Sequence, residues 1–339
     1  MPKTVNAKSL LDAIGELLLE PDVDTPSVLP AVKPARLPSL KLNSKRSKPD
    51  GLKCAVLLPD TQIGFRYYPD FGLQPFHDVT AISVALSILA TLQHEYGVDV
   101  VINLGDTMDL PQAGKYEQET VFAHTLNPSL KATHDYFASQ RAICPDAEIV
   151  YIEGNHDCRV EKLIREKTPS LFGAKRVTQD DFPVMSLPHL LALDTLNVTY
   201  QEGYKAAKYV LNPKLIAKHG TKARSNGSTA HMYLNSNPHV STLFGHSHRM
   251  ETAFKTHDTP EGPVRQLAYS PGCLCRVDGA VPSTNGAVDL HEKPVTFYEN
   301  WQQGIGVVWY KDDGDFTIES IPIFDGWAVY SGQEFRASV

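Results

Sequence analysis

The sequence has no long apolar run. Nowhere in its 339 residues does an uninterrupted apolar stretch approach the roughly 18–20 residues that a membrane-spanning helix needs. Two short leucine runs, at 10–11 and 17–19, are interrupted by Asp12 and Glu16. We therefore expect neither contact with a membrane nor a secretory signal.

Cysteine is also scarce, with five residues scattered along the chain. An odd number at wide spacing is typical of a reduced, cytoplasmic protein rather than of a disulfide framework. Cys273 and Cys275 form one close pair, but no second Cys or His pair follows at zinc-finger spacing. The sequence therefore does not predict a structural zinc site there.

An overall excess of positive charge is lacking, since 32 Lys and Arg against 39 Asp and Glu leave a net charge of −7. This balance argues against a long footprint on duplex nucleic acid. Positive charge gathers only locally, in the Pro-rich segment 21–50. We expect residues 1–50 to form a short amphipathic helix and a Pro-rich basic arm, which is either a solvated tether or a contact for a polyanion, a protein partner or a second subunit. We expect residues 51–339 to form the globular domain.

Apolar patterns in residues 51–339 alternate between strand and helix and end in a β-rich part. Strands are expected at 54–58, 98–104, 147–152, 209–211, 215–217, 239–244, 305–310 and 316–321, and helices at 77–96, 128–142 and from 159 to 166. This order predicts a layered α/β domain.

Five short polar segments each follow one of the expected strands. They are Pro59-Asp60-Thr61-Gln62, Gly105-Asp106-Thr107-Met108-Asp109, Gly154-Asn155-His156-Asp157, Lys218-His219-Gly220 and Gly245-His246-Ser247-His248. Ligands bind at the carboxyl ends of strands in open α/β sheets. Carboxylate, imidazole and amide side chains suit borderline divalent ions, and two such ions can clamp a phosphate and activate a water. The recurrence of such segments after five strands predicts a metal centre.

Single residues of this set have simpler interpretations. Asp60 or Asp106 alone is consistent with a helix cap, Gly154-Asn155 with a turn, and His219 with a histidine at a sheet edge. The ordered set of five segments is what favours metal binding.

The five segments, in this order, resemble the calcineurin-like metallophosphoesterases, and the general layout is most similar to those of phages and bacteria, with a distant likeness to DNA-repair nucleases and phosphodiesterases. The resemblance spans residues 60–248 and implies a four-layered α/β/β/α sandwich of two mixed sheets. It implies two divalent ions, of which manganese is expected and zinc, iron, nickel or magnesium are alternatives. By this resemblance Asp106 bridges the ions, Asp60, Gln62 and His248 hold the first, and Asn155, His219 and His246 hold the second.

The resemblance also implies catalytic roles. A hydroxide between the two ions attacks phosphorus, and His156 serves as general acid or contacts the phosphate. Asp157 orients His156 by a hydrogen bond, and Asp109 lies behind the ligands. Arg159, three residues after His156, is a candidate for a phosphate contact or a surface ion pair.

Gln62 departs from the family pattern, which has His at this position. Because an amide oxygen is a poorer ligand for zinc than an imidazole, three roles stay open: a weak ligand, a side chain that holds a water on the metal, or no contact. Weaker candidates elsewhere are Arg249 for phosphate, His231 for metal, the polar loop 222–226 for substrate and Trp301 for base stacking.

The expected function is a dinuclear-metal phosphodiesterase that acts on DNA, RNA or a nucleotide. The sequence around Asp109 and Gly154 lacks the arginines of the Ser/Thr phosphatase pattern. A phosphomonoesterase of the same fold stays open, as does a non-catalytic scaffold whose first metal site has decayed at Gln62.

Overall fold

The computed structural model describes residues 45–68, 72–114, 122, 124–177, 181–224, 226–260, 262–283 and 299–337. The helix expected in residues 1–20, the arm up to residue 44 and Ser225 of the polar loop lie outside the described residues. Within the described part, no helix combines the length and the apolar character needed to cross a bilayer.

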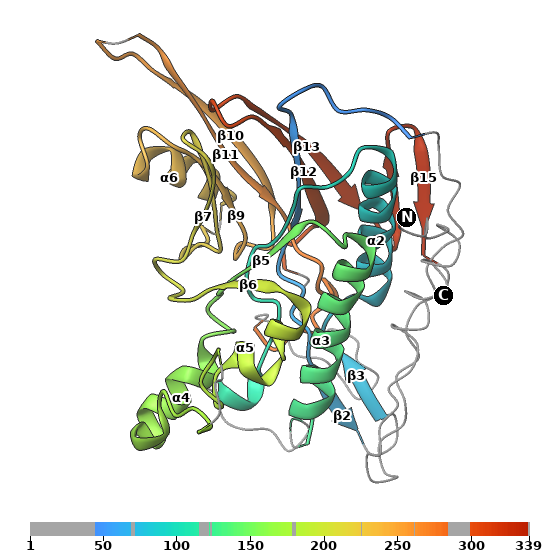
Figure 1. Ribbon diagram of the computed structural model, residues 1–339, viewed down its shortest axis with the longest axis vertical. Helices are drawn as coiled ribbons and strands as arrows, with labels where there is room; N and C mark the ends of the chain where they lie inside the picture. The colour runs from blue at the N-terminus through green and yellow to red at the C-terminus, as the bar shows by residue number, and fades with distance from the viewer. Residues whose placement is uncertain are drawn as a thin grey trace.

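Two mixed sheets form the centre of the protein (Figure 1). The six-stranded sheet has the order β13 (Phe316–Ile323), β12 (Gln303–Tyr310), β1 (Lys53–Leu58), β4 (Val100–Asn103), β5 (Glu148–Ile152) and β6 (Val198–Gln201). Strands β1, β4, β5 and β6 are parallel, and β12 and β13 run antiparallel at one side.

The five-stranded sheet has the order β10 (Met250–His257), β11 (Val264–Pro271), β9 (Ser241–Phe244), β8 (Leu215–Lys218) and β7 (Tyr209–Asn212). Its strands β8, β9 and β11 are parallel. Two further hairpins consist of β2 (Phe65–Tyr68) with β3 (Gly72–Pro75), and of β14 (Trp327–Tyr330) with β15 (Gln333–Arg336).

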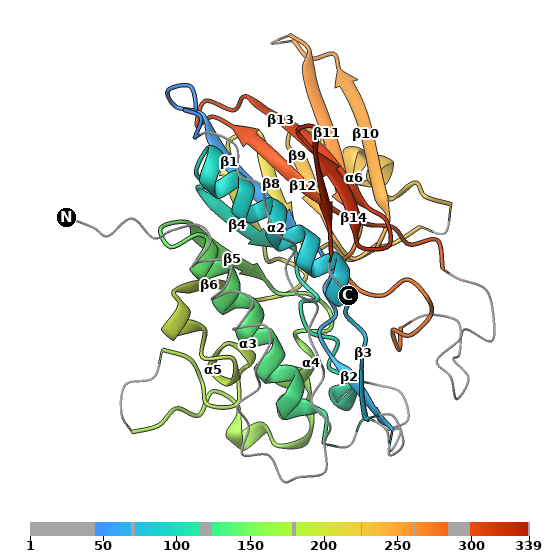
Figure 2. The same ribbon diagram turned by 90° about the vertical axis from the view of Figure 1, so that its right-hand side faces the viewer.

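Helices cover the outer faces of both sheets. In Figure 1 the order from left to right is α6 (Thr229–Ser236), the five-stranded sheet, the six-stranded sheet, and then α2 (Val79–Glu95) with α3 (Leu126–Ile143). Figure 2 shows α2 and α3 on the same side of the six-stranded sheet. The remaining helical segments are α4 (Arg159–Lys167), α5 (Leu187–Leu190) and the 3₁₀ turns η1 (Pro111–Ala113), η3 (Pro169–Leu171) and η4 (Leu193–Leu196).

Alternation along the strands explains these layers. In β1, Cys54, Val56 and Leu58 pack in the core with α2 and α3. Ala55 and Leu57, which point the other way, pack in a second core with residues of β8, β9 and β11. Both faces of β1 are therefore buried, which is why its sequence is an unbroken apolar run.

The expected α/β class and the expected elements are confirmed. Each strand and helix predicted from the patterns of residues 51–339 has a counterpart, with ends that differ by a few residues. The sequence left β2, β3, β6, β10, β11, β14, β15 and the short turns unassigned because their apolar patterns are brief or interrupted.

The described end of the basic arm lies against the domain. Arg46 Nη1 donates to Tyr96 Oη at 2.7 Å, and Lys48 Nζ pairs with Asp99 and donates to the carbonyl oxygen of Gly97 at 3.0 Å. These two cations are therefore held at the end of α2 and the start of β4.

Candidate metal centre

The polar segments that follow the five strands converge on one place between the two sheets. The chain ends of β1, β4 and β5 lie side by side because these strands are parallel neighbours, and the same holds for β8 and β9. The sheets are joined here by the backbone N–H of His246, which donates to both carboxylate oxygens of Asp60 at 3.0 Å.

The backbone of the predicted ligands is strained. Five of the seven predicted ligands have a positive φ, between 35° and 67°, although they are not glycines. They are Asp60, Gln62, Asp106, His246 and His248. Such conformations cost about 1–3 kcal/mol each and cluster at functional sites. The tight turns aim the side chains of these residues at a common point rather than along the strands.

Close packing behind the ligands requires glycine. A Cβ atom on Gly154 would lie 2.2 Å from Asp106 Oδ1, and one on Gly245 would lie 2.5 Å from Asp60 Oδ2. Because no side chain fits at these distances, the loops after β5 and β9 approach the carboxylates directly.

The first group of possible metal ligands consists of Asp60, Asp106 and His248, which are all buried and whose ligand atoms lie within 4.8 Å of one another. Nε2 of His248 is 3.2 Å from Asp60 Oδ1. The amide nitrogen of Gln62 lies 3.4 Å from both Asp106 Oδ2 and His248 Nε2. The end of the Gln62 side chain therefore reaches the same point as these three ligands.

The second group consists of Asp106, His219 and His246. Nε2 of His219 is 3.3 Å from Asp106 Oδ2 and 3.1 Å from Asn155 Oδ1. The rings of His219 and His246 meet edge to face at 5.1 Å between centroids. Asn155 thus joins this group, and Asp106 is shared by both groups.

The carbonyl oxygen of Leu104 orients His219. It lies 2.8 Å from His219 Nδ1, so that nitrogen carries a proton and donates it. This leaves Nε2, on the side of Asp106, as the nitrogen that can bind a metal ion.

The charges in the centre are strongly coupled. Burial raises the pKa of the Asp106 carboxyl, but the imidazoles of His219 and His156 outweigh it and hold that pKa well below its usual range. Burial lowers the pKa of His219, yet the negative charge of Asp106 raises it to about 9. Burial and the neighbouring His219 lower the pKa of His246 to about 4. A divalent cation at this point would replace imidazole protons as the partner of Asp106.

His156 lies beside the ligands without joining a metal group among the described residues. Its backbone N–H donates to Asp106 Oδ1 at 2.7 Å, and its Nδ1 lies 2.9 Å from the carbonyl oxygen of Asp109 and 3.1 Å from Asp109 Oδ1. Burial lowers the pKa of His156, but the charges of Asp106 and Asp109 outweigh burial and raise it. Arg159 contacts the same carbonyl of Asp109 and lies 3.1 Å from His156 Nε2.

The predicted role of Asp157 is wrong. Its carboxylate accepts hydrogen bonds from Tyr151 Oη at 2.5 Å, Gly154 N at 2.8 Å and Met108 N at 3.1 Å, and it has no bond to the His156 ring. A buried carboxylate that accepts these bonds pins the loop after β5 to that after β4. The carboxylate next to the His156 ring is Asp109, which the sequence placed only behind the ligands.

Sequence reasoning missed the surroundings of His248. The Trp301 ring lies 4.1 Å from the His248 ring, and Cys275 Sγ lies 3.9 Å from His248 Nδ1. The Cys273-x-Cys275 pair was the signal, but nothing in the spacing connects it to a residue 25 positions earlier in the chain.

Of the weaker candidates, Arg249 makes hydrogen bonds to backbone carbonyl oxygens, and His231 lies outside the metal groups of the described chain. Arg249 Nε donates to the carbonyl oxygen of Asn300 at 2.9 Å, and its Nη1 contacts that of Arg224. His231 is exposed on α6 and belongs to no metal group in the described part of the chain.

No family model matches the chain, and no curated protein matches it either.

Proposed function

We propose that the chain is a dinuclear-metal phosphoester hydrolase with the metallophosphoesterase sandwich, and that it cleaves diesters of nucleic acid or nucleotides. The single observation that carries the proposal is that Asp106, itself buried, belongs to two groups of possible metal ligands at once. Its Oδ2 faces His219 of one group and the Gln62 amide beside the other. A carboxylate between two ligand sets is what a pair of ions about 3.5–4 Å apart needs.

The fold supports the same proposal. Two mixed sheets face each other and carry helices on their outer faces. The ligands come from the ends of strands in both sheets, which is the arrangement that the family resemblance implies.

The donor set fits borderline or hard divalent ions. Carboxylates, imidazoles and one amide suit manganese, zinc, iron or nickel, and the carboxylates also suit magnesium. Gln62 Oε1 is buried and has no hydrogen-bond partner among the described residues. Because the oxygen and nitrogen of an amide are assigned from their surroundings, a rotated amide would direct this oxygen at the first ion. We therefore assign Gln62 as a weak ligand of that ion.

Bound ions would neutralise charge on the phosphoryl oxygens and would lower the pKa of a water, which gives a proton to solvent before its oxygen attacks phosphorus in line. The oxygen of the water forms a bond to phosphorus while the bond to the leaving oxygen breaks. His156 gives the proton of its Nε2 to the leaving oxygen, and Asp109 holds its Nδ1. Arg159, now 3.1 Å from that Nε2, is placed to contact a phosphate oxygen.

The experiment compares bis-p-nitrophenyl phosphate with p-nitrophenyl phosphate on metal-stripped protein that is given manganese, zinc, nickel or magnesium in turn. We expect the diester to be cleaved faster than the monoester, with manganese restoring the highest rate. Faster cleavage of the monoester would mean that the chain is a phosphatase rather than a phosphodiesterase. If protein that is shown to contain two ions cleaves neither ester, nor DNA, RNA or cyclic nucleotides, the proposed hydrolase is wrong. The chain is then a non-catalytic scaffold.

A further inference from the structure

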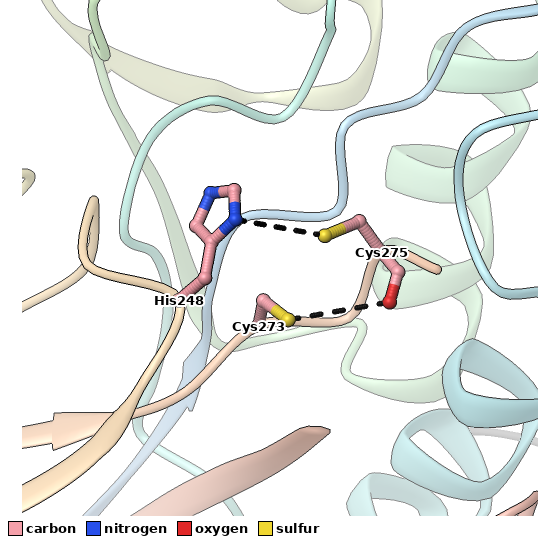
Figure 3. Close-up of side chains that lie close together, drawn as sticks. All are labelled: His248, Cys273 and Cys275. Carbon is pink, nitrogen blue, oxygen red and sulfur yellow. Dashed lines mark hydrogen bonds between the residues drawn. The ribbon is translucent and has the colours of Figure 1, made fainter. Parts of the chain in front are cut away.

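A third group of metal-binding side chains lies directly behind the candidate metal centre. It consists of His248, Cys273 and Cys275, whose ligand atoms all lie within 4.8 Å of one another. Figure 3 shows the Cys275 thiol facing His248 Nδ1 and the Cys273 thiol facing the carbonyl oxygen of Cys275. We refer to these three residues as the thiol cluster.

The backbone of the thiol cluster is held rigidly. Cys273 and Cys275 flank Leu274, which lies in a bend of the chain. Cys273 forms a bridge to Gln303 and Cys275 one to His77, and Cys273 N donates to the carbonyl oxygen of Gln302 at 3.0 Å. The positions of the two thiols are therefore set by the surrounding strands.

The distances suit one tetrahedral ion. Bond lengths of about 2.3 Å to sulfur and 2.0–2.1 Å to nitrogen put two ligand atoms about 3.6 Å apart. Cys275 Sγ and His248 Nδ1 are 3.9 Å apart, so small side-chain movements suffice. Cys273 Sγ lies 4.0 Å from the carbonyl oxygen of Cys275 and 3.5 Å from that of Gln302.

The chemistry of the thiol cluster differs from that of the candidate metal centre. Its two thiols and one imidazole are buried, and the group contains no carboxylate. Soft thiolate ligands select zinc and its heavier relative cadmium over manganese or magnesium. The residues of the two sites would therefore discriminate between ions although they share His248.

We propose that Cys273, Cys275 and His248 Nδ1 form a site for one thiophilic d¹⁰ cation, and that this ion competes with the first metal position for His248. A neutral imidazole has one unprotonated nitrogen, which is either Nε2 toward Asp60 or Nδ1 toward the thiols. Binding at the thiol cluster releases both thiol protons, and the His248 proton moves from Nδ1 to Nε2. His248 is then lost as a ligand of the first position. The inference uses the two-ion centre of the proposed function but not its hydrolytic activity.

The test adds cadmium to the reduced full chain loaded with manganese. We expect one equivalent of cadmium to produce the ultraviolet absorption of a cadmium thiolate. We also expect about half of the bound manganese to appear as free ion by electron paramagnetic resonance. The same titration of metal-free protein should give the thiolate absorption without any release of manganese. The absorption therefore tests the thiol cluster even if the chain has no hydrolase activity.

Matched variants distinguish cadmium binding at the thiol cluster from direct replacement of manganese by cadmium in the candidate metal centre. Cys273→Ser/Cys275→Ser should lose the thiolate absorption and keep its manganese at the same cadmium concentration. Cys144→Ser, which removes a buried thiol outside the thiol cluster, should behave like the wild type. If the double variant does not fold, cadmium-113 NMR of the wild type reports sulfur ligands directly.

Three results would overturn the inference. Cadmium could bind without thiolate absorption, manganese could be released equally from the double variant, or the thiolate absorption could appear while both manganese ions stay bound. The last of these would show that His248 does not connect the two sites.

Discussion

Asp106 is the residue on which both ligand groups depend. Its Oδ1 is held by the backbone N–H of His156 at 2.7 Å, while Oδ2 lies 3.3 Å from His219 Nε2. One oxygen is thus fixed by the loop after β5, and the other faces the side chains of the two ligand groups. No other carboxylate in the described chain belongs to two metal groups.

Asp106→Asn removes the charge at this shared position while keeping the shape of the side chain. We expect both ions to bind more weakly and diester cleavage to fall by ~100-fold or more. Metal content by mass spectrometry and the cleavage rate check this. Asp135→Asn, which changes a carboxylate paired with Lys131 on α3, serves as the control and should change neither value. An Asp106→Asn protein that cleaves at the wild-type rate without metal would refute the centre.

Asp109 is the partner of the general acid in our proposal. Both of its carboxylate oxygens are buried, and Oδ1 lies 3.1 Å from His156 Nδ1. Asp109→Asn should therefore lower kcat by about 10–100-fold. Since Asp109 belongs to no metal group in the described chain, the metal content should stay at two ions. A variant that loses metal but keeps its rate per bound metal would instead make Asp109 a support of the ligands.

At the scale of elements, helix α2 sets the position of the loop that holds the thiol cluster. Asp78 caps the helix through its Oδ1, which accepts from Thr80 N at 2.9 Å and Ala81 N at 3.0 Å. Its Oδ2 accepts from Gln303 Nε2 at 2.8 Å, and the same amide donates to the carbonyl oxygen of Cys275. The start of α2, the start of β12 and the Cys275 loop are therefore connected through one carboxylate.

Asp78→Ala removes this cap and should lower the free energy of unfolding by about 0.5–2 kcal/mol. Urea denaturation measures the change. Ser228→Ala is the matched control, because Ser228 precedes α6 without making a capping hydrogen bond, and its effect should stay within about 0.5 kcal/mol. Equal losses in the two variants would mean that the cap of α2 contributes nothing specific.

At the scale of the whole molecule, the candidate metal centre lies where the two sheets meet. Asp60, Asp106 and Asn155 follow strands of the six-stranded sheet, and His219 and His246 follow strands of the five-stranded sheet. Bound ions would therefore link the two halves of the core. Without ions the same residues have only hydrogen bonds and ion pairs such as His219 to Asp106.

Removal of metal should therefore lower the stability of the entire fold. Ions that bind only the folded chain add about 2.7 kcal/mol at a concentration 100 times their Kd. We expect a chelator to lower the Tm of the wild type by several degrees, and manganese to restore it. Asp106→Asn should show a much smaller response to both additions. An identical Tm with and without bound manganese would mean that the ions do not link the sheets.

The sequence by itself determined the strands, the long helices and the polar segments that follow the strands. Apolar runs such as 54–58 must be buried on both faces, and glycines such as Gly154 and Gly245 permit turns that no other residue fits. Parallel neighbours in a sheet must end at the same edge, which is why ligand types after β1, β4 and β5 meet. These are local properties of the chain, so a single sequence reveals them.

Only the tertiary structure decided which side chains are partners within the site. Asp157 accepts N–H groups of its own turn and of the neighbouring loop, whereas Asp109 reaches His156 from 47 residues away. The thiol cluster likewise joins Cys273 and Cys275 to His248 across two strands and a turn. Such contacts depend on how two sheets stack and on the direction of each side chain at the end of its strand. Neither quantity is a property of any short stretch of sequence.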